Sequence, residues 1–174
     1  MQKVNVPASR YIEALHRNQV DYVVTVPDWI QLALHARLEA GVGGIDVVPC
    51  CNEDQACAVS AGLHIGGKNP IVIIQNQGFY ACVNTIRAIG LDARLPIVFQ
   101  IGQFGKEFSL LGADPAKSTR NMVKLLEPLL STLGVRFWRI ETEADLDNFD
   151  EAFSVAKETN CPVALIIGAP IGWN

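Results

Sequence analysis

Short runs of apolar residues alternate along the chain with segments whose apolar residues recur at helical spacing. The runs rich in β-branched residues predict six strands, at 22–26, 45–48, 71–74, 96–101, 135–140 and 163–167. The helical spacing predicts helices from Ser9 to 16, over 30–38, from Asn52 to about 65, and over 82–90, 122–133 and 144–158. The run at 71–74 is entirely apolar, as is typical of a parallel sheet covered on both faces. The alternation therefore predicts an α/β fold: a doubly wound, mostly parallel sheet of about six strands with helices on both faces.

Polar residues follow three of the predicted strands. Pro27 and Asp28 follow the first strand, Asn52 and Glu53 follow the second, and Gln-Asn-Gln-Gly at 75–78 follows the third. In open parallel sheets, ligands bind in the crevice beyond the carboxyl ends of the strands. We therefore expect these three segments to meet at one edge of the sheet and to form a binding site there.

Glu53 stands at the start of the helix that follows the second strand. Asn52 is a good N-cap for this helix, and the helix dipole favours an acid in the first turn. Residues 56–62 are small except for Val59, which allows another backbone or a flat ligand to approach closely. Two interpretations stay open from spacing alone. Glu53 is either a functional carboxylate at the binding edge or only a helix-capping acid.

Composition places the chain among compact globular proteins. Its 174 residues are 49% hydrophobic and 18% charged, with a mean hydropathy of +0.21, which predicts a single domain over 1–174 that also buries surface against a partner. A net charge of -4 and an isoelectric point near 5.3 disfavour a nucleic-acid surface. The chain has no apolar run long enough to cross a membrane and no signal peptide at its amino end, so the sequence predicts a cytoplasmic protein.

Other chemistries find little support in the sequence. The five cysteines are scattered and the three histidines lie on predicted helices, so no metal-ligand spacing appears. The chain also lacks a Gly-x-Ser-x-Gly nucleophile motif and a phosphate-binding Gly-x-x-x-x-Gly-Lys loop. Residues 102–118 form the longest irregular stretch, and such segments are commonly lids, binding loops or disordered.

The segment containing Asn52, Glu53, Ala56 and Gly62 resembles one family in particular. It is similar to the segment of thiamine-diphosphate-dependent 2-oxo acid decarboxylases that carries the cofactor-activating glutamate. The resemblance implies the pyrimidine-type domain of the thiamine-diphosphate-binding fold, with Glu53 as the catalytic residue. In that role the carboxyl group binds a ring nitrogen of the aminopyrimidine and favours its imino tautomer, which then removes the thiazolium proton.

The resemblance continues in two further loops. Residues 25–28, Thr-Val-Pro-Asp, resemble the loop after the first strand of this domain type, and residues 75–84 resemble the Gln-Asn-x-Gly stretch of sulfopyruvate and phosphonopyruvate decarboxylases. The site residues that the resemblance implies for cofactor binding are Pro27, Glu53, Gln75, Asn76, Gly78 and Phe79. Two departures stand out: Tyr80 replaces a usual glycine, and the paired histidines of pyruvate decarboxylases are missing.

The resemblance also predicts a partner subunit. The Gly-Asp-Gly segment that holds the cofactor diphosphate through Mg²⁺ in such enzymes does not occur in this sequence. The chain is also short for an enzyme with both domains. It therefore resembles a separate alpha subunit, with thiamine diphosphate shared with a diphosphate-binding beta subunit that holds the Mg²⁺, in a homodimer or a larger hetero-oligomer. The alternative is a non-catalytic doubly wound domain that binds a nucleotide or a protein partner.

The substrate that this resemblance implies is a short 2-oxo acid with a second anionic group, such as sulfopyruvate or phosphonopyruvate. Asp28, Gln77 and Lys106 are the predicted substrate-binding residues, and Arg120 is a second basic candidate for the anionic group. Both basic residues lie in or next to the long irregular stretch, where a solvated surface role is the ordinary alternative.

Overall fold

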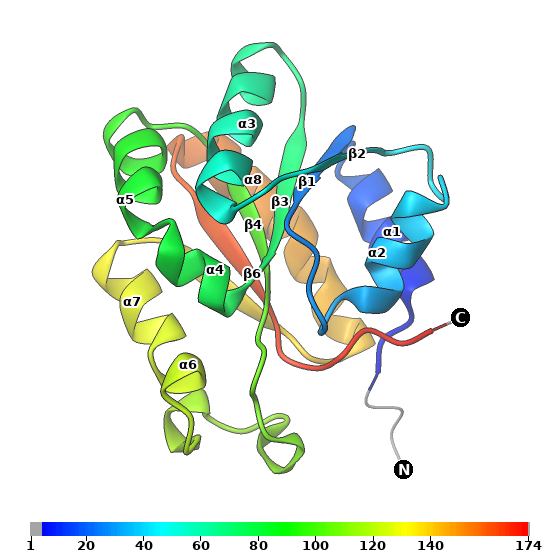
Figure 1. The fold of residues 1–174 in the computed structure, drawn as a ribbon, viewed down its shortest axis with the longest axis vertical. Coiled ribbons are helices and arrows are strands. Elements are labelled where there is room, and N and C mark those ends of the chain that lie inside the picture. The colour runs from blue at the N-terminus through cyan, green and yellow to red at the C-terminus, as the bar shows by residue number, and fades with distance from the viewer. Residues whose placement is uncertain (1–4, 174) are drawn as a thin grey trace.

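A computed structural model describes residues 5–173, which form a parallel sheet between two layers of helices (Figure 1). The strand order is β2-β1-β3-β4-β6-β5, and every neighbouring pair is parallel. The strands are β1 (Tyr22–Thr25), β2 (Asp46–Pro49), β3 (Pro70–Gln75), β4 (Val98–Gly102), β5 (Arg136–Ile140) and β6 (Val163–Ile167). The predicted six-stranded, doubly wound parallel sheet is confirmed.

The helices divide between the two faces of the sheet. One face is covered by α1 (Ala8–Arg17), α2 (Leu32–Glu39) and α8 (Asn148–Thr159). The other is covered by α3 (Glu53–Ile65), α4 (Asn76–Ala81), α5 (Val83–Thr85) with the π-helical turn Ile86–Asp92, and α7 (Leu126–Thr132), which follows the short α6 (Asn121–Lys124). Short 3₁₀ turns occur at Phe108–Leu110, Pro115–Lys117 and Glu143–Asp147.

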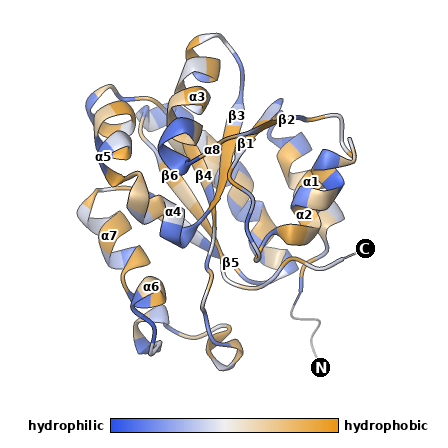
Figure 2. Cartoon of the chain, viewed as in Figure 1, coloured by the Kyte–Doolittle hydropathy of each residue, from blue (hydrophilic) through white to orange (hydrophobic). Residues whose placement is uncertain are grey.

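The strand β3 shows why the sheet is buried on both sides. Its side chains alternate, with Ile71 and Ile73 in the core beneath α1, α2 and α8, and Val72 and Ile74 in the core beneath α3, α4 and α7. All four are fully buried, as the entirely apolar run predicted. Figure 2 shows the apolar strands between helices whose outer faces are more polar.

Several helix boundaries differ from the sequence-based prediction. The largest difference is α4, which begins at Asn76 immediately after β3, where the apolar spacing predicted no helix before 82. Asn76 accepts a hydrogen bond from the backbone N–H of Gln77, which helps to start the helix. The predicted helix at 122–133 is two helices separated at Leu125, and the one at 144–158 starts with a 3₁₀ turn that Thr142 caps.

The carboxyl ends of the strands lie level with one another. Thr25 at the end of β1 pairs in register with Pro49 of β2, and Gln75 at the end of β3 pairs with Gly102 of β4, which pairs with Ile167 of β6. The segment after β6 then turns back across this edge, where the N–H of Ile171 donates to the carbonyl oxygen of Ile30 at 2.8 Å. This edge, which we call the carboxyl edge, therefore collects the loops after β1, β2, β3, β4 and β6.

Among residues 5–173, no helix combines the length and hydropathy needed to span a membrane. Within the same residues, no cluster of three or more His, Cys, Asp or Glu side chains is arranged to hold a metal ion.

Candidate functional site

The first turn of α3 fixes the position of Glu53 at the carboxyl edge. Asn52 is the N-cap, and its side chain accepts a hydrogen bond from the backbone N–H of Gln55 at 2.8 Å. The side chain of Gln55 reaches back and accepts from the N–H of Cys51, also at 2.8 Å. These two reciprocal bonds hold the turn much as a capping box does. The carboxylate of Glu53 therefore projects from a well-fixed backbone.

The Glu53 side chain lies directly against Gly78 of α4. A Cβ atom at position 78 would overlap the Cγ, Cδ and Oε1 atoms of Glu53, so only glycine leaves room for the carboxylate there. Glu53 is partly buried, and within residues 5–173 it makes no hydrogen bond and no ion pair. A partly buried carboxylate without a protein partner is the feature expected of a group that receives a hydrogen-bonding ligand.

Asp28 is also at the carboxyl edge, but its carboxylate is bound inside the protein. It is buried and accepts hydrogen bonds from the N–H groups of Ile30 at 2.7 Å and Gln31 at 3.1 Å, and from the side chain of Gln31 at 2.6 Å. Gly102 lies so close that a Cβ there would come within 2.7 Å of the carboxylate. The substrate-binding role of Asp28 stays a prediction, and the structure gives this residue a role in holding β1 to the start of α2.

Asn76 ties the third strand end to the long irregular segment. Its side-chain nitrogen donates to the carbonyl oxygens of Phe104 at 3.0 Å and Met122 at 2.9 Å, and the side chain is fully buried. Gln77, one residue further, is exposed. The two polar residues therefore differ in accessibility: Asn76 is buried and holds the neighbouring backbone, and Gln77 is exposed.

The Asn76 contacts support a stability prediction. We expect Asn76→Ala to lower the free energy of unfolding by about 2 kcal/mol, because the carbonyl oxygen of Phe104 loses its side-chain donor and that of Met122 keeps only the Tyr80 hydroxyl group. Gln77→Ala, in the same turn but exposed, serves as the control and should change it by less than about 0.5 kcal/mol. Urea unfolding of both variants measures the difference. Equal effects would show that the Asn76 bonds do not hold the segment.

Phe79 and Tyr80 lie behind the site and not in it. Phe79 is fully buried in the core, where its ring meets that of Phe99 edge to face at a centroid distance of 5.6 Å. The hydroxyl group of Tyr80 donates to the carbonyl oxygen of Met122 at 2.8 Å, and burial raises the pKa of this phenol to about 12. Tyr80, which stands where the resembling family usually has glycine, therefore anchors α6 to α4.

Lys106 forms a buried ion pair instead of facing solvent. Its ammonium group pairs with the carboxylate of Glu141, which follows β5 and also accepts from the N–H of Gly112. The Lys106 side chain is only 2% exposed. Its predicted contact with substrate stays a prediction, and the structure shows that its charge is already balanced by Glu141.

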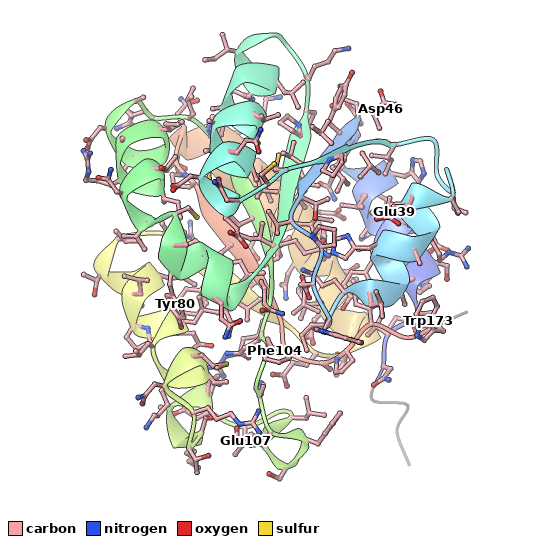
Figure 3. All side chains as sticks on the ribbon, in the orientation of Figure 1. Glu39, Asp46, Tyr80, Phe104, Glu107 and Trp173 are labelled. Atoms are coloured by element: carbon pink, nitrogen blue, oxygen red, sulfur yellow. The ribbon has the colours of Figure 1, made fainter. Side chains whose placement is uncertain are left out.

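Glu107 closes the tip of the irregular segment into a compact loop (Figure 3). Its carboxylate accepts hydrogen bonds from the hydroxyl groups of Ser118 at 2.7 Å and Thr119 at 2.9 Å, and from the N–H of Thr119 at 3.1 Å. These bonds, above all the one from Ser118, lower the pKa of Glu107 from its ordinary value of 4.5 to about 2. The segment predicted as irregular is therefore an ordered loop, in which the Glu107 carboxylate joins residue 107 to residues 118 and 119.

The lowered pKa predicts how the stability should depend on pH. Since the folded pKa lies below the unfolded one, the stabilisation by ionised Glu107 is complete above about pH 4.5 and disappears as the pH falls towards 2. We expect the melting temperature of Glu107→Gln to lie below that of the parent at neutral pH, with a gap that narrows steadily below pH 4.5. Glu39→Gln, at an exposed position on α2, provides the control. A gap that does not change with pH would contradict the assignment.

A cavity of about 310 Å³ opens at the carboxyl edge beside this loop. It is lined by residues after β1 (Trp29, Ile30), after β4 (Gln103, Phe104, Gly105, Lys106, Phe108, Leu111, Arg120) and after β6 (Gly168, Pro170). A smaller hollow of about 170 Å³ lies at Pro27, Asp28, Trp29 and Leu32. A larger one, about 610 Å³, lies at the opposite edge, where β3 and β4 begin. We consider the carboxyl edge the functional one, because the unpaired Glu53 lies there.

Sequence reasoning missed three residues of this edge: Trp29, Gln103 and Glu141. Gln103 was detectable, because it follows β4 just as Asn52 and Asn76 follow β2 and β3. Glu141 became visible only through its ion pair with Lys106, which joins segments 35 residues apart in the sequence. Pro27 and Gln75, both predicted to contact the cofactor, lie at the same edge. Pro27 is exposed and Gln75 is half-buried.

Comparison with known proteins adds sequence and structural relatives. No protein family model matches the chain. It is 26% identical to the sulfopyruvate decarboxylase subunit alpha of Methanothermobacter thermautotrophicus over 110 residues, which are 62% of this chain and 66% of that protein. It is 24% identical to the subunit of the same name from Methanocaldococcus jannaschii over 157 residues, which are 90% of this chain and 89% of that protein.

Among solved structures, benzoylformate decarboxylase from Polynucleobacter necessarius superposes with a TM-score of 0.70 and 18% sequence identity. The match covers 93% of this chain. The chain has the fold of one part of that decarboxylase. This chain spans 29% of the length of the benzoylformate decarboxylase chain, so the likeness concerns the fold of the matched part alone.

Proposed function

We propose that this chain is the pyrimidine-binding alpha subunit of a two-subunit, thiamine-diphosphate-dependent decarboxylase of short 2-oxo acids, such as sulfopyruvate or phosphonopyruvate. The observation that carries the proposal is the unpaired Glu53 carboxylate lying against Gly78 at the carboxyl edge. Two relatives named sulfopyruvate decarboxylase subunit alpha support the reaction class and the need for a partner. The partner would be a diphosphate-binding beta subunit that holds the Mg²⁺.

The residues present fit the cofactor at its pyrimidine end. The Glu53 carboxyl group would hold a proton and share it with a ring nitrogen of the aminopyrimidine, an interaction that a partly buried acid without a protein partner is free to make. Because Gly78 has no side chain, it leaves the space that the Glu53 carboxyl group occupies. Once bound, thiamine diphosphate supplies the nucleophilic carbon and the electron sink for decarboxylation.

The remaining predicted cofactor residues would act in two ways. Asn76 and Phe79 have buried side chains, so they would support the wall of the site from behind. Pro27, Gln75 and the backbone of Gly78 lie at the edge itself, where they would shape the surface that meets the cofactor and exclude water from it. Of the three predicted substrate residues, Gln77 is exposed and its side chain contacts only the sulfur atom of Met122, at 3.9 Å. The side chain of Asp28 is already hydrogen-bonded to Gln31, and that of Lys106 is paired with Glu141.

Reconstitution tests the proposal. The chain should release CO₂ from sulfopyruvate or phosphonopyruvate only when it is mixed with thiamine diphosphate, Mg²⁺ and the beta subunit that co-purifies with it. Alone, it should bind the cofactor weakly, because the described residues offer the diphosphate no metal site. Tight binding of thiamine diphosphate by the isolated chain would overturn the division of the site between two subunits.

A further inference from the structure

The cavity at the carboxyl edge carries an uncompensated positive charge. Of its two basic residues, Lys106 is neutralised by the partly buried carboxylate of Glu141. Arg120 is different: its guanidinium donates to the carbonyl oxygen of Gly105 at 3.1 Å, and within residues 5–173 it has no ion pair. The two carboxylates of this loop, Glu107 and Asp114, do not line the cavity, and Glu107 is bound to Ser118 and Thr119. Arg120 is therefore the cation that an acidic ligand would meet.

A second donor in the same cavity has no partner among residues 5–173. Gln103 is 1% exposed, yet its side-chain nitrogen Nε2 makes no hydrogen bond within the described residues. Leaving a buried amide donor unpaired is costly, so a ligand that accepts its hydrogen bond would be favoured. An acidic oxygen is such an acceptor, and it also satisfies Arg120.

The cavity walls suit a small ligand. Trp29 and Phe108, which are 73% and 72% exposed, stand among its lining residues together with Phe104. The aromatic side chains offer apolar surface to a small ligand, and Arg120 offers the charge. A volume of about 310 Å³ is at the lower limit of small-molecule sites, which favours a short acid over a nucleotide.

Contacts link this cavity to Glu53. Glu53 lies against Gly78, and Asn76, two residues earlier on the same helix, donates to the carbonyl oxygens of Phe104 and Met122. Gly105, which follows Phe104, is held by Arg120. The first turn of α4 therefore joins the carboxylate that is proposed to activate the cofactor to the loop that carries the free cation.

We propose that this cavity binds the second acidic group, sulfonate or phosphonate, of the 2-oxo acid substrate, with Arg120 as the cation and the Gln103 amide as a donor. The inference rests on the proposed function and assigns the residues that select doubly acidic substrates over pyruvate. Lys106 has the different task of positioning the loop through Glu141.

Binding to the chain itself is the first test and needs no catalysis. Sulfoacetate, an unreactive compound with two acidic groups, should shift the NMR signals of the Gln103 side-chain amide and the Trp29 indole N–H. Arg120→Gln should weaken this binding by at least about 10-fold, and Arg120→Lys by less. The matched control is Lys117→Gln, which removes a charge from the same loop outside the cavity and should leave the affinity within about 2-fold. Absence of shifts at both groups, or equal losses in Arg120→Gln and Lys117→Gln, would overturn the inference.

Selectivity in the assembled enzyme is the second test. Arg120→Gln should lower kcat/KM for sulfopyruvate by at least about 10-fold while that for pyruvate changes little, so that the ratio of the two falls. An unchanged ratio in an active enzyme would overturn the assignment of Arg120 and leave the proposed function standing. Failure of the parent to decarboxylate any 2-oxo acid would overturn the proposed function, whatever the binding test shows.

Discussion

Replacement of Glu53 by glutamine is expected to leave the chain folded and to lower the decarboxylation rate of the assembled enzyme by at least about 100-fold. Glutamine has nearly the same shape, so its side chain still fits against Gly78. It cannot share an acidic proton with a ring nitrogen, however, and the proposed activation of the cofactor depends on that proton. Circular dichroism and urea unfolding check the fold, and initial rates of CO₂ release check the activity.

Asp54→Asn is the matched control for this variant. Asp54 is the next residue of the same first turn, is exposed, and interacts with the helix dipole in the same way as Glu53. Its replacement should therefore reproduce any effect that comes only from losing a first-turn acid. If the two variants lose activity equally, Glu53 is no more than a helix-capping acid.

Replacement of Gly78 by alanine is expected to separate activity from stability. The added Cβ would occupy the space of the Glu53 carboxylate, so the flexible Glu53 side chain must rotate away from its site. Because alanine also favours a helix over glycine, the free energy of unfolding should stay within about 1 kcal/mol of the parent. The decarboxylation rate should nevertheless fall by about 100-fold, as for Glu53→Gln.

The double variant shows whether Gly78 acts through Glu53. If it does, Gly78→Ala combined with Glu53→Gln should lose little more activity than Glu53→Gln alone, because the second change displaces a group that no longer functions. Losses that multiply would show that Gly78 contributes separately. A stability loss of several kcal/mol in Gly78→Ala would instead show that the glycine is needed for packing.

The fold was predictable because its signals are local. The apolar run of β3 predicted a strand covered on both faces, and the order of strands and helices predicted the parallel sheet. The edge that holds Glu53 followed from the rule that ligands bind at the carboxyl ends of strands. The start of α4 at Asn76 was not predicted, because that turn is stabilised by contacts with Phe104 and Met122, far away in the sequence.

The roles of the charged residues were harder to predict, because they depend on partners that no local pattern reveals. Lys106 and Arg120 look equivalent in the sequence, as basic residues of one segment. In the structure Glu141 neutralises the first and leaves the second available to a ligand. Asp28 likewise looks in the sequence like a substrate-binding residue of a loop. In the structure its carboxylate oxygens accept hydrogen bonds from the N–H groups at the start of α2 and from the side chain of Gln31.

The most direct test of the central claim is the rate of CO₂ release from sulfopyruvate and phosphonopyruvate by the purified complex of this chain with the proposed beta subunit. We predict turnover of at least one of the two that requires thiamine diphosphate, requires both subunits, and is lost in Glu53→Gln but kept in Asp54→Asn. Turnover that persists without thiamine diphosphate or in Glu53→Gln would contradict the account, and so would a well-formed complex that decarboxylates neither acid.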